Sequence, residues 1–402
     1  SGTTHRHPTL HTTGCSSRPH SLRMDPAAGW TGGYGAAGSE AGAPAAAAGA
    51  KAAAAEAVSA RTRQDQAESE VEAATIGTRC AGKWDGAAGS VFGPFVRRDA
   101  ASRSRWRKAV AVALLPVAVV RLVLFVGLAV VYWGAHAWLP RRGACWRIRR
   151  MVLYALLRAV AAVIGFVAVS IVGARPPPSA MPPVIVANHM SYLDVLFLLM
   201  LFQPAFVSAA CARHVPIIGP IATSLRCLFV DFDAGAPATS LSAAIAARVG
   251  SYRSPEADAD VGERDDETAV PLAIFPEGTT TNGTALLRFR TGAFVPLAPV
   301  LPVIIEYPHA TFSPAWESIE MWWHILFLLT AVYHSVTVTI LPPAHPSPDQ
   351  SPREYADAVA EIIATRARLP IVDARRSDKL LWHAVLRGRL TLAEALARSS
   401  VA

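Results

Sequence analysis

Charged residues are scarce in this chain. Of its 402 residues, Asp, Glu, Lys and Arg make up 17%, whereas hydrophobic residues make up 52%. This balance is apolar for a soluble enzyme. Alanine accounts for part of the excess, so the places where apolar residues gather carry more weight than their total.

Cysteine is also rare, and its spacing excludes several kinds of site. None of the five cysteines belongs to a Cys-x-x-Cys pair or to a His/Cys spacing suited to zinc. An odd number without a disulfide framework is typical of a reducing, cytosol-facing site. We therefore expect no metal site. The cysteines are Cys15, Cys80, Cys145, Cys211 and Cys227.

The charge that is present is unbalanced. The formal net charge is +8, which suits either nucleic acid or an anionic membrane surface. The basic residues cluster beside apolar segments rather than among aromatic side chains that could stack on bases. This pattern favours a membrane bilayer as the partner and argues against nucleic acid.

Residues 1–100 form a low-complexity segment rich in Ala, Gly, Ser, Thr and Arg. The segment has no apolar stripe that could form a core, which predicts that it is largely disordered. A transit peptide is an alternative, because acidic residues are few before Glu56. No cleavable signal peptide is visible. Because the chain starts at Ser1 rather than Met, loss or processing of the natural N-terminus stays open.

Residues 101–178 are predicted to be membrane-associated helical segments. The apolar stretch 109–140 exceeds the ~20 residues that span a bilayer. Its two flanks are both rich in arginine, which the positive-inside rule would place on the cytosolic side. Pro116 and Arg121 interrupt the stretch, so we expect a re-entrant or interfacial hairpin. A second apolar segment, 151–173, is expected to be membrane-embedded or surface-docked, with a buried core helix as the alternative.

From residue 179 the pattern changes to α/β. Short β-branched runs alternate with helix-like segments, which predicts a mostly parallel sheet flanked by helices. The expected domain covers 179–345, and a helical extension covers 346–402. The acidic stretch 254–268 is expected to be an exposed loop, and 322–333 to be a core helix or to touch lipid. The predicted strands are 184–186, 228–230, 271–275, 303–305 and 336–340, and the predicted helices are 191–202, 240–249 and 353–367.

The sequence Asn188-His189-Met190-Ser191-Tyr192-Leu193-Asp194 directly follows a predicted strand. On one straight helix, His189 and Asp194 would point ~140° apart. They can meet if His189 lies in the turn and Asp194 in the first turn of the next helix. Ser-x-x-Asp before an apolar run is also a capping-box pattern. A histidine oriented by a carboxylate is a general base for a hydroxyl group. Alone, the pattern equally allows a helix cap beside an ordinary turn residue.

A second motif, Phe275-Pro276-Glu277-Gly278-Thr279-Thr280, ends another predicted strand. The turn after it offers backbone N–H groups and hydroxyls to a phosphate or a polar head group. Arg288 and Arg290 follow and are able to pair with phosphate. The structural alternative is a strand-to-loop transition with a solvated Glu277.

Together the two motifs resemble the blocks NHxxxxD and FPEGT of the lysophospholipid acyltransferase superfamily, which includes glycerol-3-phosphate and 1-acylglycerol-3-phosphate acyltransferases. Residues 299–304 are similar to its proline-entered fourth block, and finer similarity extends from Pro116 to about Leu396. The chain looks most like the lysophosphatidylcholine and lysophosphatidylethanolamine acyltransferase branch. The resemblance implies a glycerol-3-phosphate acyltransferase-like α/β fold.

Two departures from the family are visible. Phe232 stands where the second block usually has an arginine that contacts the acceptor phosphate, so other cations such as Arg226, Arg288 and Arg290 are expected to serve. This departure weakens the case for a strongly anionic acceptor such as lysophosphatidate. No Asp-x-Asp-x-Asp-Gly loop is present, so calcium control through an EF-hand of this chain is not expected.

The resemblance implies transfer from acyl-CoA, the co-substrate, to a lysophospholipid in phospholipid synthesis or remodelling, without a metal or bound cofactor. His189 and Asp194 would be catalytic, and Glu277, Gly278, Thr279, Thr280, Arg288 and Arg290 would bind substrate. The implied location is the endoplasmic reticulum membrane with a cytosol-facing site, with a plastid as the alternative. Open alternatives are a lysophosphatidate acceptor, a CoA-independent transacylase and a catalytically silent lipid-binding protein. A serine hydrolase is disfavoured, because no Gly-x-Ser-x-Gly motif is present.

Overall fold

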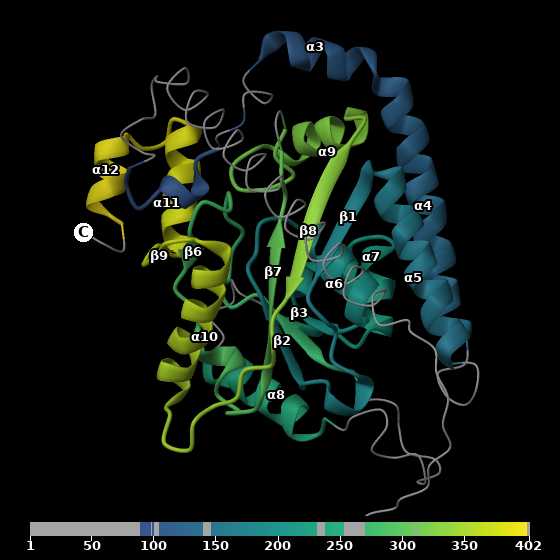
Figure 1. Cartoon of the computed structure of the whole chain (residues 1–402). Coiled ribbons are helices and arrows are strands. Elements are labelled where there is room, and N and C mark those ends of the chain that lie inside the picture. The colour runs from purple at the N-terminus through teal and green to yellow at the C-terminus, as the bar shows by residue number, and fades with distance from the viewer. Residues whose placement is uncertain are drawn as a thin grey trace, which may run out of the picture. The chain divides into compact units, whose positions relative to one another are not determined.

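The protein is described by a computed structural model that covers residues 89–97, 99, 104–139, 146–230, 238–252, 270–309 and 312–399. Its centre is a seven-stranded sheet, counted over these residues, in the order β1-β8-β7-β2-β5-β3-β4 (Figure 1). All neighbouring strands are parallel except β7 and β8. The predicted mostly parallel α/β sheet is therefore confirmed. The strands are β1 Phe166–Val172, β2 Val184–Ala187, β3 Ala205–Ala209, β4 Leu228–Val230, β5 Leu272–Ile274, β7 Val300–Glu306 and β8 His334–Ile340.

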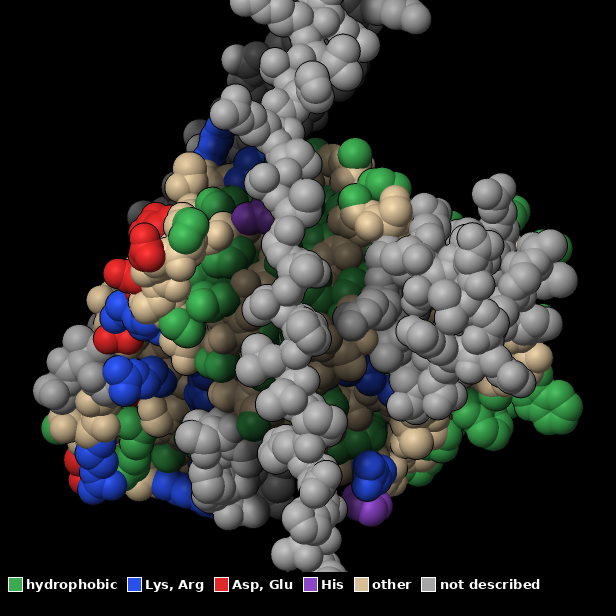
Figure 2. Space-filling view, turned by 90° about the horizontal axis from the view of Figure 1, so that it is seen from below, with side chains coloured by type: hydrophobic (Ala, Val, Ile, Leu, Met, Phe, Trp, Pro, Cys, Tyr) green, Lys and Arg blue, Asp and Glu red, His purple; other side chains and the backbone are tan. Residues whose placement is uncertain are grey.

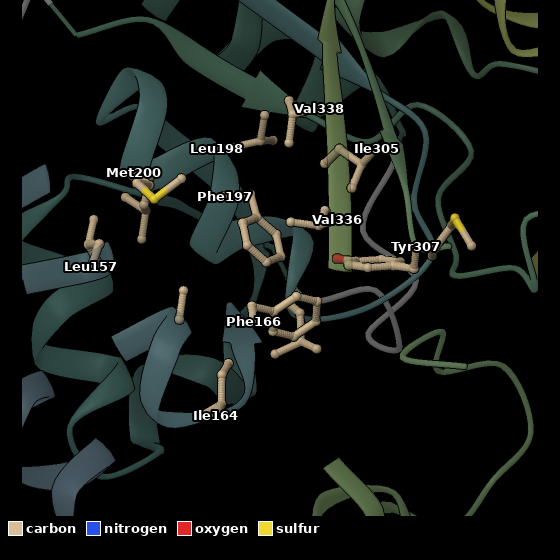
Figure 3. Packing of buried hydrophobic residues seen from close by; sticks show 14 of the residues in the cluster. Leu157, Ile164, Phe166, Phe197, Leu198, Met200, Ile305, Tyr307, Val336 and Val338 are labelled. Carbon is tan, nitrogen blue, oxygen red and sulfur yellow. The ribbon is translucent and has the colours of Figure 1, made fainter. Parts of the chain in front are cut away.

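The sheet is buried on both faces, as parallel sheets generally are. Successive side chains of a strand point to opposite faces, and β2 shows both sides of the core. Val184 and Val186 pack in one apolar cluster with α8 and α10. Ile185 and Ala187 pack in the other cluster with α5, α6 and α9, part of which is drawn in Figure 3. The helices are α5 Trp146–Val163, α6 Asp194–Phe202, α7 Ile218–Ser224, α8 Ala238–Gly250, α9 Met321–Thr330 and α10 Pro352–Ala367.

The hairpin predicted within residues 109–140 is wrong. A short helix, α3 Arg105–Ala113, is followed after Leu114 by the unbroken helix α4 Leu115–Trp138. Pro116 lies in the first turn of α4, where its missing N–H costs no hydrogen bond. Arg121 does not break the helix, because its Nη1 donates to the carbonyl oxygens of Leu329 (2.9 Å) and Ala331 (2.6 Å) at the end of α9. Among the described residues, α4 alone is long and apolar enough to cross a membrane.

The second apolar segment, 151–173, is not one helix. Its first part belongs to α5, which lies beside α4 along one flank of the sheet (Figure 1). Leu153, Leu157 and Ala161 of α5 face the core, while Met151 and Tyr154 are exposed. The remainder forms the edge strand β1, paired in parallel with β8. The run 166–172 after Gly165 is rich in β-branched residues, which favours a strand.

The end of the segment predicted to be disordered is ordered. Phe92 and Phe95 are fully buried and pack with Trp382 and Val385 of the C-terminal region. Residues 1–88, the acidic loop 254–268 and Phe232 lie outside the described residues. The C-terminal extension contains α10, α11 Arg376–Leu386 and α12 Leu392–Ala397, and its strand β9 Ile371–Val372 pairs in parallel with β6 Leu286–Leu287. Short 3-10 helices cover Gly93–Phe95, Pro178–Ala180, Ala210–His214 and Thr291–Ala293.

Candidate active site

The two sequence motifs follow β2 and β5, which are neighbours in the sheet and run parallel. Both motifs therefore leave the sheet at its carboxyl edge, where open α/β sheets bind ligands. The hydrogen bond between His189 Nδ1 and Asp194 Oδ2 is 2.8 Å long. His189 lies in the turn after β2, and α6 begins at Asp194. The geometry expected for a histidine oriented by a carboxylate is thus present.

The capping box predicted at Ser191 is formed only in part, and α6 has Leu193 as its N-cap. The Asp194 carboxylate accepts from the backbone N–H of Ser191 (2.9 Å), which is one half of a capping box, and also from that of Met190 (2.8 Å). Ser191 Oγ accepts from the N–H of Leu193 at 3.3 Å. The carboxylate closes the turn and holds the imidazole at the same time.

The other oxygen of Asp194 is also engaged. Oδ1 accepts a short hydrogen bond from the Tyr307 hydroxyl at the end of β7. Burial, followed by the Asp194 carboxylate, raises the pKa of Tyr307 well above its usual value, so the phenol remains a donor. The Tyr307 ring packs against Phe166 and Phe197 (Figure 3). Asp194 is fully buried and has four donors, which satisfies a carboxylate without water.

The His189 ring is fixed but reachable. It stacks on Phe275 at a centroid distance of 4.0 Å, and 19% of its side chain is exposed. Asn188 anchors the preceding residue, because its side chain donates to the Ile305 carbonyl (2.9 Å) and accepts from the Ile305 N–H (2.7 Å). Within the described residues no hydrogen bond engages His189 Nε2. Nε2 is therefore the ring nitrogen that a substrate hydroxyl can reach.

Glu277 faces inward rather than toward a ligand. Its side chain is buried, Oε1 accepts from the His189 N–H at 2.6 Å, and Oε2 accepts from the Leu287 N–H at 2.9 Å. Burial raises the pKa of Glu277 to about 8, and the two N–H donors act against that rise. The predicted solvated or substrate-binding Glu277 does not match this position. The side chain braces the turn that carries His189.

The residues after Glu277 divide into two groups. Gly278 is exposed and Thr279 is half-buried, so both are accessible. Gly278 has φ +72°, and an added Cβ would lie 2.7 Å from Arg290 Nε, which explains the glycine. Thr280 is buried, and its hydroxyl donates to the Trp316 carbonyl at 2.5 Å.

The two predicted arginines lie in different surroundings. Arg288 pairs with Asp357 of α10 at 3.2 Å, and Asp357 also binds Arg353. Arg290 lies over Gly278, next to the accessible part of the turn. Arg290 is therefore better placed than Arg288 to meet a ligand of the turn.

Three groups that support the turn could not be found from the motifs. Lys379 of α11 is buried, and its Nζ donates to Thr280 Oγ1 (2.6 Å) and to the Thr280 carbonyl (3.0 Å). The Asn282 amide donates to the carbonyls of Gly93 and Val96, and the Tyr307 hydroxyl binds Asp194. Each contact joins segments distant in sequence, so no local sequence pattern predicts it. The Asn-Gly turn at 282–283 was the one usable signal.

Residues 168–306 match the family model described as Acyltransferase. We refer to these residues as the acyltransferase segment. The acyltransferase segment runs from within β1 to the end of β7 and contains both sequence motifs. Lys379 lies outside it, and so do Gly93 and Val96, whose carbonyls accept from Asn282. The family needs no metal cofactor, and the described residues contain no cluster of three or more side chains able to hold a metal ion.

The curated relatives that this chain matches are named lysophospholipid or lysophosphatidylcholine acyltransferases. Lysophospholipid acyltransferase LPEAT1 of Arabidopsis thaliana is 38% identical over 52% of this chain and 51% of its own length. Lysophosphatidylcholine acyltransferase 1 of Danio rerio is 30% identical over 60% of this chain and 44% of its own. The chain spans about half the length of the curated relatives it matches. The predicted similarity to this branch is confirmed.

A solved structure is also similar. The crystal structure of the 1-acyl-sn-glycerophosphate (LPA) acyltransferase PlsC from Thermotoga maritima aligns with 65% of this chain and 94% of that chain, at 18% identity and a TM-score of 0.43.

Proposed function

We propose that this protein transfers an acyl group from acyl-CoA to the free hydroxyl of a lysophospholipid, lysophosphatidylcholine or lysophosphatidylethanolamine. The observation that carries the proposal is the 2.8 Å hydrogen bond between His189 Nδ1 and Asp194. It fixes the tautomer in which Nδ1 carries the proton and Nε2 is a base. The names of the curated relatives support the class of acceptor.

The proposed chemistry is a direct transfer in one site. The acceptor oxygen attacks the thioester carbonyl carbon while His189 Nε2 removes the hydroxyl proton. The carbon–sulfur bond then breaks, and CoA leaves as a thiolate, which takes up the proton. Asp194 stabilises the imidazolium that forms between the two steps. The reaction needs no metal and no covalent intermediate on the protein.

The remaining predicted site residues act on position rather than on the transferred group. Glu277 holds the backbone of His189 in place, and Thr280 is held by Lys379. Gly278, Thr279 and Arg290 offer accessible polar groups beside the histidine. Holding both substrates in one geometry is itself a large catalytic contribution.

The proposed location is a membrane surface, and the endoplasmic reticulum with a cytosol-facing site suits the free cysteines Cys211 and Cys227. The outward side of α4 is an apolar strip. Apolar side chains also project on the side of α4 and α5 in the view from below (Figure 2). Exposed apolar residues of α4 and α9 include Val119, Val120, Val123, Leu124, Val131, Met321 and Trp322.

We place α4 along the bilayer surface layer rather than across the bilayer. Arg121 near its start binds carbonyls of α9, and the Tyr132 hydroxyl near its end donates to Gln203 at 2.9 Å. Both ends of the helix are thus tied to the α/β domain. A helix crossing the bilayer alone would have to break these contacts, whereas an interfacial helix keeps its outer face in lipid.

The test is transfer by the purified full chain in lipid–detergent micelles. Labelled acyl-CoA is offered with lysophosphatidylcholine, lysophosphatidylethanolamine, lysophosphatidate and no acceptor, and the Asp194→Asn variant is run in parallel. We expect labelled diacyl product with the first two acceptors. Preference for lysophosphatidate would replace the proposed acceptor, transfer only from an added phospholipid would indicate a transacylase, and no transfer to any acceptor would reject the enzymatic proposal.

A further inference from the structure

The first turn of α11 lies over the Glu277–Thr280 turn, although it comes about a hundred residues later in the chain. Lys379 Nζ fixes this position through its bonds to Thr280 Oγ1 and the Thr280 carbonyl. Arg376 precedes Lys379 by three residues on α11, so both side chains lie on the same face of the helix. Burial lowers the pKa of Lys379, and the charge of Arg376 lowers it further, as expected for two cations held close together.

The pairing of β6 with β9 brings a third cation, Arg290, to the start of α11 beside Lys379 and Arg376. β6 and β9 are parallel, with Leu287 opposite Val372, and the Arg288 N–H donates to the Val372 carbonyl at 3.1 Å. Arg290 follows β6, while Arg375 and Arg376 follow β9. Because paired parallel strands end on the same side, Arg290, Arg375 and Arg376 follow the same end of this two-stranded ribbon. Arg290 then lies directly over Gly278, beside the accessible part of the turn.

The local charge is positive. Partial loss of solvent contact lowers the pKa of Arg290, and Arg376 and Arg375 lower it further, as expected for like charges held close together. Three acidic groups are near. Asp373 is exposed and lies 3.9 Å from Arg375, Asp378 is buried and accepts from the Arg375 N–H, and Glu317 is buried beside Arg97. Two of the three carboxylates are thus turned inward, while Arg290 and Arg375 remain exposed.

We propose that Arg290, Arg375 and Arg376 form a phosphate-binding patch that holds a phosphate group of one substrate beside His189. Guanidinium groups suit phosphate because they donate two parallel hydrogen bonds. The assignment rests on the proposed function, in which the phosphates belong either to CoA or to the lysophospholipid head group. It also supplies cations that the second block lacks at Phe232. Two of the three arginines lie outside the acyltransferase segment 168–306.

The test compares two double variants, one at each end of α11. Arg375→Gln/Arg376→Gln removes two charges at the start of α11, and the matched control Arg387→Gln/Arg389→Gln removes two exposed charges at its end. KM is measured separately for acyl-CoA and for lysophosphatidylcholine. We expect the first variant to raise one of the two KM values about tenfold or more, equivalent to ~1.4 kcal/mol, with kcat little changed. The substrate whose KM rises identifies the phosphate. Equal KM values in both variants would overturn the patch.

A binding measurement separates this inference from the proposed function. The full chain is titrated with adenosine 3′,5′-bisphosphate, the nucleotide end of CoA, and with glycerophosphocholine. If the wild type transfers no acyl group but binds one probe and the Arg375/Arg376 variant does not, the patch stands and the proposed function fails. If binding is the same in the wild type, this variant and the control, the patch is rejected whether or not transfer occurs. Specific binding should also weaken as salt is raised.

Discussion

The backbone N–H of His189 donates to Glu277 Oε1 at 2.6 Å. This bond joins the turn after β2 to the turn after β5, and Glu277 Oε2 continues the connection to Leu287. A carboxylate at position 277 therefore sets where the histidine backbone lies. This contact gives a structural reason for a carboxylate in the second motif.

Replacement of Asp194 by Asn should affect both rate and stability. The amide keeps one acceptor oxygen but turns an NH2 group toward donors, so at least one buried N–H or O–H loses its partner. We expect kcat to fall by ~10²–10⁴ because His189 loses its orientation, and the free energy of unfolding to fall by ~1–3 kcal/mol. Transfer assays and urea unfolding measure the two effects. Tyr307→Phe, which removes one donor and leaves three, should cost clearly less in kcat. An equal loss of kcat in both variants would contradict the orienting role.

The contribution of Glu277 and Glu317 to stability should fall as pH rises from about 5 to 8, whereas His324, His334 and His383, whose pKa values burial lowers, act in the opposite direction below about pH 6.5. Burial raises the pKa of Glu277 from 4.5 to about 8 and that of Glu317 from 4.5 to about 7. In this window the folded state keeps protons that the unfolded state has released, so the unfolded state is favoured as pH increases. Thermal unfolding between pH 5 and 8.5 measures the slope. Glu277→Gln, which cannot ionise, should make stability fall less, or rise more, with pH than in the wild type, and an unchanged slope would show that Glu277 titrates normally.

Lys379 is predicted to position Thr280 rather than to touch substrate. Lys379→Met keeps the length of the side chain but leaves the Thr280 carbonyl without its ammonium donor. We expect kcat/KM to fall about tenfold, which corresponds to ~1.4 kcal/mol of transition-state stabilisation. Lys379→Gln retains a donor and should recover part of the loss. If the methionine and glutamine variants are equally impaired while both remain folded, the hydrogen bonds are not the cause.

The buried ion pairs of Arg97 should matter more for stability than the exposed pair of Arg288. Arg97 is buried and binds Asp99 and Glu317, whereas Arg288 and Asp357 are 51% and 38% exposed. Removing one partner of a buried pair costs ~3–5 kcal/mol, and exposed pairs contribute ~0–1 kcal/mol. Chemical unfolding of Arg97→Met and Arg288→Met compares them directly. Similar losses would show that the segment around Arg97 is not part of the folded core.

The α/β pattern and the meeting of His189 with Asp194 were predictable from sequence. Alternating β-branched runs and helices are local signals, and the strand-turn-helix context of His189 limits where Asp194 can lie. The predicted strand 228–230 and helix 353–367 lie within one residue of β4 and α10. The helix start at Asp194 was missed because Ser191 Oγ accepts from the N–H of Leu193 rather than from that of Asp194, and the helix begins only after Leu193.

Contacts between distant segments were not predictable. Glu277 reads as an exposed motif residue, yet both of its oxygens bind backbone N–H groups. The order of residues 89–97 depends on Trp382 and Asn282, which a composition argument on the first hundred residues does not include. The stretch 151–173 is apolar apart from Arg158 and Ser170, so its hydrophobicity alone did not separate its helix from the β-branched strand that pairs with β8.

The most direct test of the account is the rate of acyl transfer by His189→Ala. Without the imidazole Asp194 keeps three of its four donors, so the variant should remain folded, as circular dichroism and the unfolding midpoint will show. With saturating acyl-CoA and lysophosphatidylcholine, we predict that kcat falls at least ~10²-fold, the contribution typical of a general base. A folded His189→Ala protein that transfers acyl groups at the wild-type rate would contradict the role of His189 as the general base.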